Sequence, residues 1–256
     1  MANLKKQITT SKLSRLDDLL VLRGEANSKT QARALIMAGL VFHADTRLEK
    51  PGQKVNIGIE ISVRQKPHPW VSRGGIKLEH GLEYFNIPIY NKVCMDVGSS
   101  TGGFTDVLLS KGAGKVYAID SGTGQLDWKL RKLEKVVVHE RTNARYLTSA
   151  HIPEPIDVIT CDASFISLTK VLPTPLSFAK NGAYLVALIK PQFEAGREFV
   201  GKGGVIVDPK VHQSVCKKIF DWLASQPGWT PQGIEPSPIT GPKGNREFLV
   251  AAQLLD

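Results

Sequence analysis

The fold of most of this chain is indicated by one stretch, Val93-Cys-Met-Asp-Val-Gly-Ser-Ser-Thr-Gly-Gly-Phe104. It opens with an apolar run typical of a buried strand and continues into a loop that is rich in glycine. Glycines let a loop backbone approach a ligand closely, and the helix that should follow turns its N-terminus toward the same place. The loop lacks the G-x-G-x-x-G spacing of dinucleotide-binding folds and the lysine of a P-loop. It therefore predicts a strand–loop–helix unit that binds a different ligand.

Strand and helix patterns alternate around this stretch. The apolar runs that predict strands are Val93–Val97, Lys115–Ile119, Val136–His139, Ile156–Cys161 and Tyr184–Ile189. Helical patterns fill the gaps, at Thr105–Lys111, Gln125–Lys132, Leu168–Lys180 and Val211–Ser225. Such alternation predicts an α/β fold with a mostly parallel, doubly wound sheet and a ligand at the carboxyl edge of its strands. Two last runs, Thr230–Glu235 and Glu247–Leu254, lie too close for a crossover helix and should form a hairpin with one antiparallel strand.

Two acidic residues flank the glycine-rich loop. Asp96 precedes its first glycine, and Asp120 ends the second predicted strand. In dinucleotide-binding folds the acid at the end of the second strand holds ribose hydroxyls. With no P-loop lysine nearby, these acids favour a nucleoside ligand that lacks phosphates.

Basic charge is concentrated in the first quarter of the chain. Residues 1–66 carry 12 Lys and Arg against 6 Asp and Glu, whereas the remaining residues carry 21 against 18. A basic module joined to a nearly neutral one suggests a polyanion-binding domain that delivers substrate to a catalytic domain. A lysine-rich surface that serves only solubility is the alternative.

The N-terminal pattern predicts two short helices followed by short strands. The first helix should span Arg15–Arg23 and end at Gly24. The second should begin at Ser28, because Ser28-Lys-Thr-Gln31 has the form of a capping box, and Gly39 should stop it. Alternating polarity predicts strands within Val41–Leu48 and Val55–Val63. Prolines then indicate a linker, so the expected domains are 1–64 and 72–256, with the linker at 65–71.

Composition excludes several classes of protein. The chain has 256 residues, of which 42% are hydrophobic and 22% charged, so disorder is not its main state. Its longest strongly apolar stretch, Ala183–Ile189, is far shorter than the roughly 20 residues that span a bilayer. The first residues do not form a secretory signal, and we therefore expect a cytoplasmic protein. Cys94, Cys161 and Cys216 are too scattered for a disulfide framework or a zinc site, which predicts reduced thiols and no metal.

Two resemblances extend this reading. Arg15-Leu-Asp, Ser28-Lys-Thr-Gln-Ala-Arg33 and Met37-Ala-Gly-Leu-Val41 resemble the small RNA-binding domain first described in the fourth small-subunit ribosomal protein. Nearly the whole chain, including this N-terminal domain, resembles the TlyA family of FtsJ-like ribosomal RNA 2'-O-methyltransferases, which are often labelled haemolysins. The motifs that carry this second resemblance are Asp120–Arg131, Glu140–Leu147, Cys161–Leu168, Leu188–Glu194 and Gly241–Leu249. One departure is Ser121-Gly-Thr123, where the family pattern has Val-Gly-Tyr.

The family resemblance implies a Rossmann-like class I methyltransferase with a seven-stranded sheet and S-adenosyl-L-methionine as its cofactor. The implied cofactor-binding residues are Asp96, Gly98, Ser99, Gly102, Gly103, Phe104, Asp120, Asn143, Ala144 and Asp162. Asn143 should contact the adenine edge, although a helix cap is the alternative. Phe104 and Phe165 are expected to pack rather than to stack on a ligand.

The resemblance also implies a catalytic Lys-Asp-Lys-Glu tetrad, formed by Lys77, Asp162, Lys190 and Glu247. Lys190 would accept the proton of the ribose 2'-hydroxyl, because that hydroxyl is a poor nucleophile until its proton is removed or polarised. Asp162 would orient Lys190 and the methyl acceptor. Lys77 and Glu247 would position the ribose and its phosphate.

Three basic residues are predicted to bind RNA. Lys29 and Arg33 lie on the polar face of the second N-terminal helix, and Arg73 lies before the helix that carries Lys77. For Arg73, a simple surface charge is the alternative. The expected partners are ribosomal RNA or ribosomal subunits, and the expected reaction is 2'-O-methylation, at cytidine according to the resemblance. Two other functions stay open, a non-catalytic ribosome assembly factor and a membrane-lytic protein.

Overall fold

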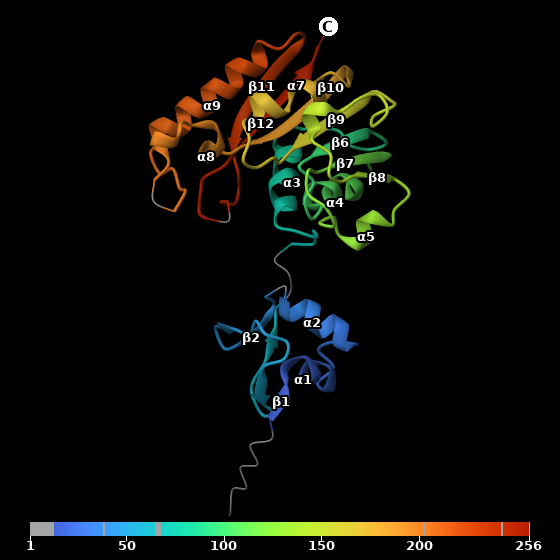
Figure 1. Ribbon diagram of the computed structural model, residues 1–256, viewed down its shortest axis with the longest axis vertical. Helices are drawn as coiled ribbons and strands as arrows, with labels where there is room; N and C mark the ends of the chain where they lie inside the picture. Colours follow the sequence, from blue (N-terminus) through green and yellow to red (C-terminus); the bar gives the residue numbers. More distant parts are fainter. Residues whose placement is uncertain (1–12, 38, 65–67, 202, 242, 256) are drawn as a thin grey trace, which may run out of the picture. The chain divides into compact units, whose positions relative to one another are not determined.

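The computed structural model describes residues 13–37, 39–64, 68–201, 203–241 and 243–255. The chain divides into two compact units, Met1–Pro69 and Trp70–Asp256 (Figure 1). Residues 65–67, which belong to the linker expected from the sequence, lie outside the described residues. Trp70, near the end of that segment, is buried in the same apolar cluster as Leu78 and Phe104. Its side chain therefore belongs to the second unit.

The first unit packs two helices on short strands, as the N-terminal pattern predicts. Helix α1 spans Leu16–Leu22 and helix α2 spans Lys29–Met37. The strands are β1 Leu13–Arg15, β2 Val41–His43, β3 Thr46–Arg47, β4 Lys54–Asn56 and β5 Ser62–Val63. They pair in the orders β1-β4 and β3-β2-β5. The core that holds helices and strands together contains Leu16, Leu19, Leu20, Ala32, Ile36, Val41 and Val55.

The residues that were predicted to begin and end the helices of this unit lie at the helix ends. Ser28 Oγ accepts a hydrogen bond from the amide of Gln31 at 3.2 Å, and Gln31 Oε1 accepts one from the amide of Asn27 at 2.7 Å. The first bond satisfies an amide that the first turn of the helix leaves free, and the second ties the residue before the cap to that turn. Gly24 and Gly39, with φ of 74° and 69°, follow the two helices.

The second unit is built on the sheet that the strand and helix alternation predicts. Its strand order is β11-β12-β10-β9-β6-β7-β8. The strands are β6 Val93–Val97, β7 Lys115–Ile119, β8 Val136–His139, β9 Ile156–Cys161, β10 Ala179–Ile189, β11 Trp229–Pro236 and β12 Phe248–Leu254. Strand β12 pairs antiparallel with both β10 and β11, which confirms the predicted hairpin with one antiparallel strand. The parallel strands β6, β7, β9 and β10 thus end at one edge.

Helices cover both faces of this sheet (Figure 1). On one face α3 Gly74–Tyr84 and α4 Gly103–Ser110 pack on residues such as Cys94 and Val186. On the other, α6 Leu168–Val171, α7 Pro173–Leu176 and α9 Pro209–Ala224 cover residues such as Met95 and Leu185. Shorter helices complete the unit, namely α5 Trp128–Arg131, α8 Pro191–Glu194, and the 3-10 turns η1 Ala144–Tyr146 and η2 Arg197–Phe199.

The prediction of one helix over Leu168–Lys180 is wrong. The segment forms two single-turn helices, and β10 already begins at Ala179. Pro173 starts the second helix, because a proline lacks the amide that would continue the first one and fits best in the first turn of a new helix.

The cysteines are free, as expected. Cys94 and Cys161 are buried between the sheet and its helices, and Cys216 is partly buried on α9. Burial raises the pKa of the Cys216 thiol to about 11 and that of Cys161 to about 12. All three therefore stay protonated near neutral pH and are poor nucleophiles.

Candidate active site

A cavity of about 600 Å³ opens where the parallel strands end. Its wall is formed by the loop after β6, the residues that follow β9 and β10, the start of α3, and the segment before β12. The lining residues are Ser72, Arg73, Gly74, Lys77, Gly98, Ser99, Ser100, Thr101, Gly103, Phe104, Asp162, Ser164, Phe165, Lys190, Gln192, Phe193, Val200, Gly204, Gly241, Lys243, Asn245 and Glu247. The volume is in the range of sites that hold small molecules and cofactors.

Two glycines of the predicted ligand loop allow close approach of neighbouring backbone. Gly98 has φ of 80°, and a Cβ there would lie 3.0 Å from the carbonyl oxygen of Asp162. At Gly103, a Cβ would collide with Ser72 Oγ and lie 3.0 Å from the amide nitrogen of Gly75. Side chains at these positions would push the loop away from β9 and α4 away from α3. The glycines therefore keep the loop tight at the cavity wall.

Asp96 lies beneath the loop, and it is absent from the cavity lining among the described residues. Its side chain is fully buried and accepts hydrogen bonds from Thr105 Oγ1 at 2.7 Å and Thr160 Oγ1 at 3.2 Å. Burial raises the pKa of Asp96 to about 7, although the bond from Thr105 opposes this change. These contacts tie β6 to α4 and β9, so the structure shows Asp96 supporting the loop from behind.

Asp120 anchors the far end of the same loop. Its carboxylate accepts hydrogen bonds from the amides of Ser100 at 2.8 Å and Gly122 at 2.7 Å. Since Ser100 lines the cavity, Asp120 lies just behind the wall, at the end of β7.

Asn143 and Ala144 have local structural roles. Asn143 Oδ1 caps the turn η1 by accepting the amide of Arg145 at 3.1 Å, which is the alternative that the sequence left open. The Ala144 side chain is buried in the core on the sheet face that α6, α7 and α9 cover. Neither residue lines the cavity in the described part of the chain, and neither does Gly102. The predicted cofactor contacts of these residues stay predictions.

The four residues of the predicted tetrad come together on the cavity wall as two ion pairs. Lys77 Nζ, from α3, lies 2.5 Å from Glu247 Oε2, directly before β12. Lys190 Nζ, after β10, lies 2.5 Å from Asp162 Oδ1, after β9. The first pair is almost fully buried, with side chains 6% and 1% exposed. In the second pair the Asp162 side chain is 22% exposed and more accessible from the cavity.

Lys190 has further contacts that fix its ammonium. Its Nζ donates to Ser164 Oγ at 2.9 Å and to the backbone oxygen of Asp162 at 3.3 Å. Ser164 was missed by the sequence reasoning, although it lies in the quoted segment after β9.

Asn245, which also lines the cavity, was missed by the sequence reasoning as well. It joins two loops at the cavity by donating to Gly204 O at 2.8 Å and accepting from the amide of Ile206 at 3.0 Å.

Phe165 was expected to pack rather than to stack on a ligand, and the structure does not place it in the core. Its side chain is 90% exposed, and its backbone has φ of 64°. The ring lies 4.9 Å from that of Phe193 on the cavity wall. Phe104, by contrast, is only 3% exposed and packs in the core, as expected.

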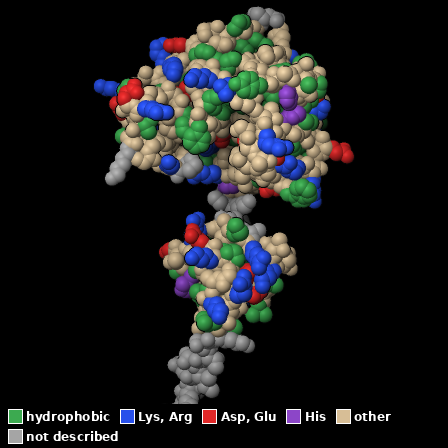
Figure 2. All heavy atoms as spheres, viewed as in Figure 1, with side chains coloured by type: hydrophobic (Ala, Val, Ile, Leu, Met, Phe, Trp, Pro, Cys, Tyr) green, Lys and Arg blue, Asp and Glu red, His purple; other side chains and the backbone are tan. Residues whose placement is uncertain are grey.

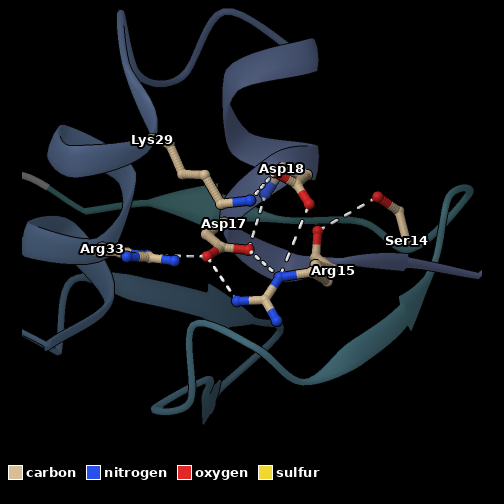
Figure 3. Close-up of polar contacts among 6 residues, drawn as sticks. All are labelled: Ser14, Arg15, Asp17, Asp18, Lys29 and Arg33. Atoms are coloured by element: carbon tan, nitrogen blue, oxygen red, sulfur yellow. Dashed lines mark hydrogen bonds and ion pairs between the residues drawn. The ribbon is translucent and has the colours of Figure 1, made fainter.

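The predicted RNA-binding residues are exposed and carry partners within their own units. Lys29 Nζ lies 2.7 Å from Asp18 Oδ1, and Arg33 Nε lies 3.1 Å from Asp17 Oδ2 (Figure 3). Arg73 donates to the carbonyl of Thr240 at 3.2 Å at the cavity rim. Figure 2 shows Lys and Arg side chains on the surface of the N-terminal unit, with acidic side chains beside them.

Neither a metal-binding cluster nor a membrane-spanning helix occurs among the described residues. These residues contain no cluster of His, Cys, Asp or Glu that could hold a metal ion. Among their helices, none is both long and apolar enough to cross a membrane.

Comparison with known proteins identifies the family. Residues 70–254 match the FtsJ-like methyltransferase family, and residues 14–61 match the S4 domain. YqxC of Bacillus subtilis is 48% identical over 242 residues, which is 94% of this chain and 86% of that protein. The 16S/23S rRNA (cytidine-2'-O)-methyltransferase TlyA of Mycobacterium tuberculosis is 44% identical over 238 residues, 93% of this chain and 88% of its own length. A solved structure of a hemolysin-labelled protein from Streptococcus thermophilus superposes with a TM-score of 0.72 at 38% identity, covering 96% of this chain and 90% of that one. The chain therefore belongs to the TlyA family of FtsJ-like methyltransferases that carry an N-terminal S4 domain.

Proposed function

We propose that this protein transfers a methyl group from S-adenosyl-L-methionine to the 2'-hydroxyl of a cytidine in ribosomal RNA. The observation that carries the proposal is the pairing of Lys190 with Asp162 and of Lys77 with Glu247 on one cavity wall, beside the glycine loop. An S4 domain at residues 14–61 and the rRNA methyltransferase activity named for the Mycobacterium tuberculosis relative support an RNA substrate. A ribosomal substrate also supports a cytoplasmic location.

The described residues fit S-adenosyl-L-methionine, the cofactor of this family. The cavity has the volume of a cofactor site, and the close backbone contacts at Gly98 and Gly103 keep the glycine loop tight at its wall. Ser99 and Phe104 also line the wall, and Asp120 lies at the end of β7, where an acid can reach ribose hydroxyls. When bound, this cofactor supplies an electrophilic methyl group on a sulfonium centre.

Lys190 is the residue proposed to take the proton of the RNA 2'-hydroxyl. A lysine accepts a proton only as a neutral amine, so the ammonium must first pass its own proton on. Asp162 Oδ1, at 2.5 Å, is the nearest carboxylate to that ammonium. Ser164 and Asp162 together hold Nζ in one position, which matches the need for fixed geometry in general base catalysis.

The second ion pair is proposed to position the acceptor ribose and its phosphate. Lys77 and Glu247 are almost fully buried, so their charges are compensated within the pair rather than by water. Arg73, at the rim of the same cavity, is exposed and proposed to contact the phosphate backbone.

The test is methyl transfer to RNA that lacks the modification. Ribosomal subunits from cells without the gene are incubated with the protein and labelled S-adenosyl-L-methionine, and nucleosides are identified by mass spectrometry. We expect label in 2'-O-methylcytidine. Label on a base would contradict the ribose acceptor. RNA binding and cofactor binding without any transfer would instead support a non-catalytic assembly factor.

A further inference from the structure

A buried carboxylate in the N-terminal unit holds two exposed arginines. Asp17 lies in the first turn of α1, and its side chain has 0% exposure. Arg15 donates to it through two nitrogens, with Nε 2.9 Å from Oδ1 and Nη2 2.9 Å from Oδ2. Arg33, from α2, donates through Nε to Oδ2 at 3.1 Å (Figure 3). One carboxylate thus connects the start of α1 with the exposed face of α2.

The charge balance of this group leaves it positive. The hydrogen bond from Arg15 is the largest cause that holds the pKa of Asp17 well below its usual range, so the carboxylate is ionised at neutral pH, despite its burial. The group contains three cations, Arg15, Arg33 and Lys29, and two carboxylates, Asp17 and Asp18, which leaves one uncompensated positive charge. The arginine side chains remain 43% and 53% exposed, so this charge faces solvent.

Both guanidinium groups keep donors for a further ligand. A guanidinium has five N–H donors. In the hydrogen bonds of the described residues, Arg15 uses Nε and Nη2, and Arg33 uses Nε. Arg15 also lies beside Gly52, where a Cβ would come within 3.1 Å of Nη1. The two hydrogen bonds to Asp17 therefore orient this guanidinium, and the glycine leaves room for it.

We propose that Asp17 is a positioning residue that fixes Arg15 and Arg33 as a two-arginine clamp for phosphates of the RNA backbone. The proposal rests on the RNA-binding function proposed above and names the residue that organises the contact. Guanidinium groups bind phosphate through parallel N–H bonds, and a pre-oriented side chain loses less rotational freedom on binding. Sequence reasoning identified Arg33 and Lys29 as RNA-binding residues but missed Arg15, which it quoted as the start of a helix and as part of a family motif without giving it a role.

Removal of the Asp17 charge distinguishes a positioning role from simple electrostatics, because the two roles predict opposite changes in RNA affinity. Asp17→Asn raises the net charge of the protein by one, so a purely electrostatic surface would bind RNA at least as tightly as before. If Asp17 positions the clamp, the same variant binds more weakly. We expect its affinity to fall about tenfold, with a salt dependence flatter by roughly one unit of log-log slope. Asp18→Asn is the matched control. Asp18 is 45% exposed, pairs with Lys29 at 2.7 Å and lies 3.7 Å from Arg15 Nε, so the variant removes one negative charge but keeps both hydrogen bonds from Arg15 to Asp17. It should bind RNA at least as well as the wild type.

The measurement uses the full chain and unmodified ribosomal RNA transcribed in vitro, with affinity read by fluorescence anisotropy at several salt concentrations. Methyl transfer supplies a second readout. Asp17→Asn should raise the KM for RNA while kcat and cofactor affinity stay within about twofold of wild type. An Asp17→Asn protein that is folded and binds RNA as tightly as wild type overturns the clamp. If the wild type itself neither binds this RNA nor methylates it, the proposed function fails instead.

If circular dichroism shows that Asp17→Asn unfolds the N-terminal unit, a variant that keeps Asp17 tests the clamp instead. Arg33→Lys keeps the charge, but one ammonium cannot hold Asp17 and a phosphate in the geometry of a guanidinium. We expect it to weaken RNA binding at least threefold, whereas Arg47→Lys, the same exchange at an exposed arginine of this unit that pairs with Glu49, should not. Equal affinities for Arg33→Lys and the wild type overturn the clamp.

Discussion

Lys190 is the side chain at which chemistry can be tested apart from folding. Lys77→Ala would leave the carboxylate of Glu247 buried without its partner, which costs about 3–5 kcal/mol and confuses activity with stability. The partner of Lys190 is Asp162, whose side chain is 22% exposed, so loss of Lys190 leaves a less deeply buried carboxylate than loss of Lys77 does.

We expect Lys190→Ala to lose methyl transfer by about 100-fold or more, the scale of a general base, with near-normal affinity for cofactor and RNA. Lys190→Arg should fail as well, because arginine keeps its proton at all relevant pH values. Single-turnover transfer to undermodified ribosomal subunits measures both variants. If Lys190→Arg retained most of the activity, Lys190 would act only as a positive charge.

Asp96 gives a prediction about stability and pH. Burial raises its pKa in the folded protein from 3.8 to about 7. The folded state therefore binds the proton more tightly than the unfolded state, and the stability that this proton contributes is full below pH 4 and is lost as pH rises through 7. Across that range the wild type should lose a few kcal/mol relative to Asp96→Asn, whose side chain does not ionise, since each pKa unit corresponds to about 1.4 kcal/mol. Urea unfolding of both proteins at pH 5 and pH 8 measures this, and a difference that does not change with pH would contradict it.

At the level of elements, the contact between α3 and α4 determines where the cavity wall lies. Gly103 begins α4, against Ser72 and Gly75 at the start of α3. Gly103→Ala should push these helices apart and weaken cofactor binding at least tenfold, because both helices contribute residues to the wall. Adding Ser72→Ala removes the hydroxyl that the new methyl group meets and should restore part of the affinity, whereas Ser72→Ala alone should have little effect. Calorimetry with S-adenosyl-L-methionine compares the variants, and normal binding by Gly103→Ala would exclude this role of the glycine.

The sequence predicted strands better than it predicted the surroundings of single side chains. Strands β6 to β9 have the predicted bounds, because strands that are covered on both faces leave continuous apolar runs. The pairing of Lys190 with Asp162 also follows, since both end neighbouring parallel strands. Spacing cannot tell whether an acid such as Asp96 lines a cavity or lies behind it. Nor does it show that Phe165 is exposed, because that depends on a backbone conformation which local patterns do not encode.

At the level of the whole molecule, basic charge and catalytic groups lie in different units. The N-terminal unit contains Asp17 and its two arginines, and the larger unit contains the cavity and both ion pairs. The residues that build the glycine loop, its supporting carboxylates and the tetrad all belong to residues 70–256. Cofactor binding should therefore need only the larger unit, whereas tight RNA binding should need both.

The prediction that cofactor binding needs only the larger unit can be tested with fragments of the chain. The design of these fragments depends on the residue at which the larger unit begins. Trp70 is 7% exposed, shares a core cluster with Phe104, and lies against Gly75, where a Cβ would collide with its ring. Its Nε1 donates to Glu79 Oε2 at 3.3 Å on α3. Deleting Trp70 would leave a cavity in the core beside the start of α3, next to the wall that is proposed to hold the cofactor. Truncation of a large buried aromatic side chain commonly costs about 3–5 kcal/mol.

We therefore expect a fragment of residues 68–256 to bind S-adenosyl-L-methionine with an affinity within about threefold of the full chain. A fragment of residues 72–256 should bind it at least tenfold more weakly and melt at a lower temperature, because the Trp70 ring is missing from the core. Full-length Trp70→Ala should share the loss of cofactor affinity, which separates the effect of the ring from that of chain length. Calorimetry and thermal unfolding by circular dichroism compare the three proteins with the full chain. Equal cofactor affinity in the two fragments would mean that the tryptophan contributes nothing to the wall, and weak binding by both would mean that the cofactor site depends on the N-terminal unit.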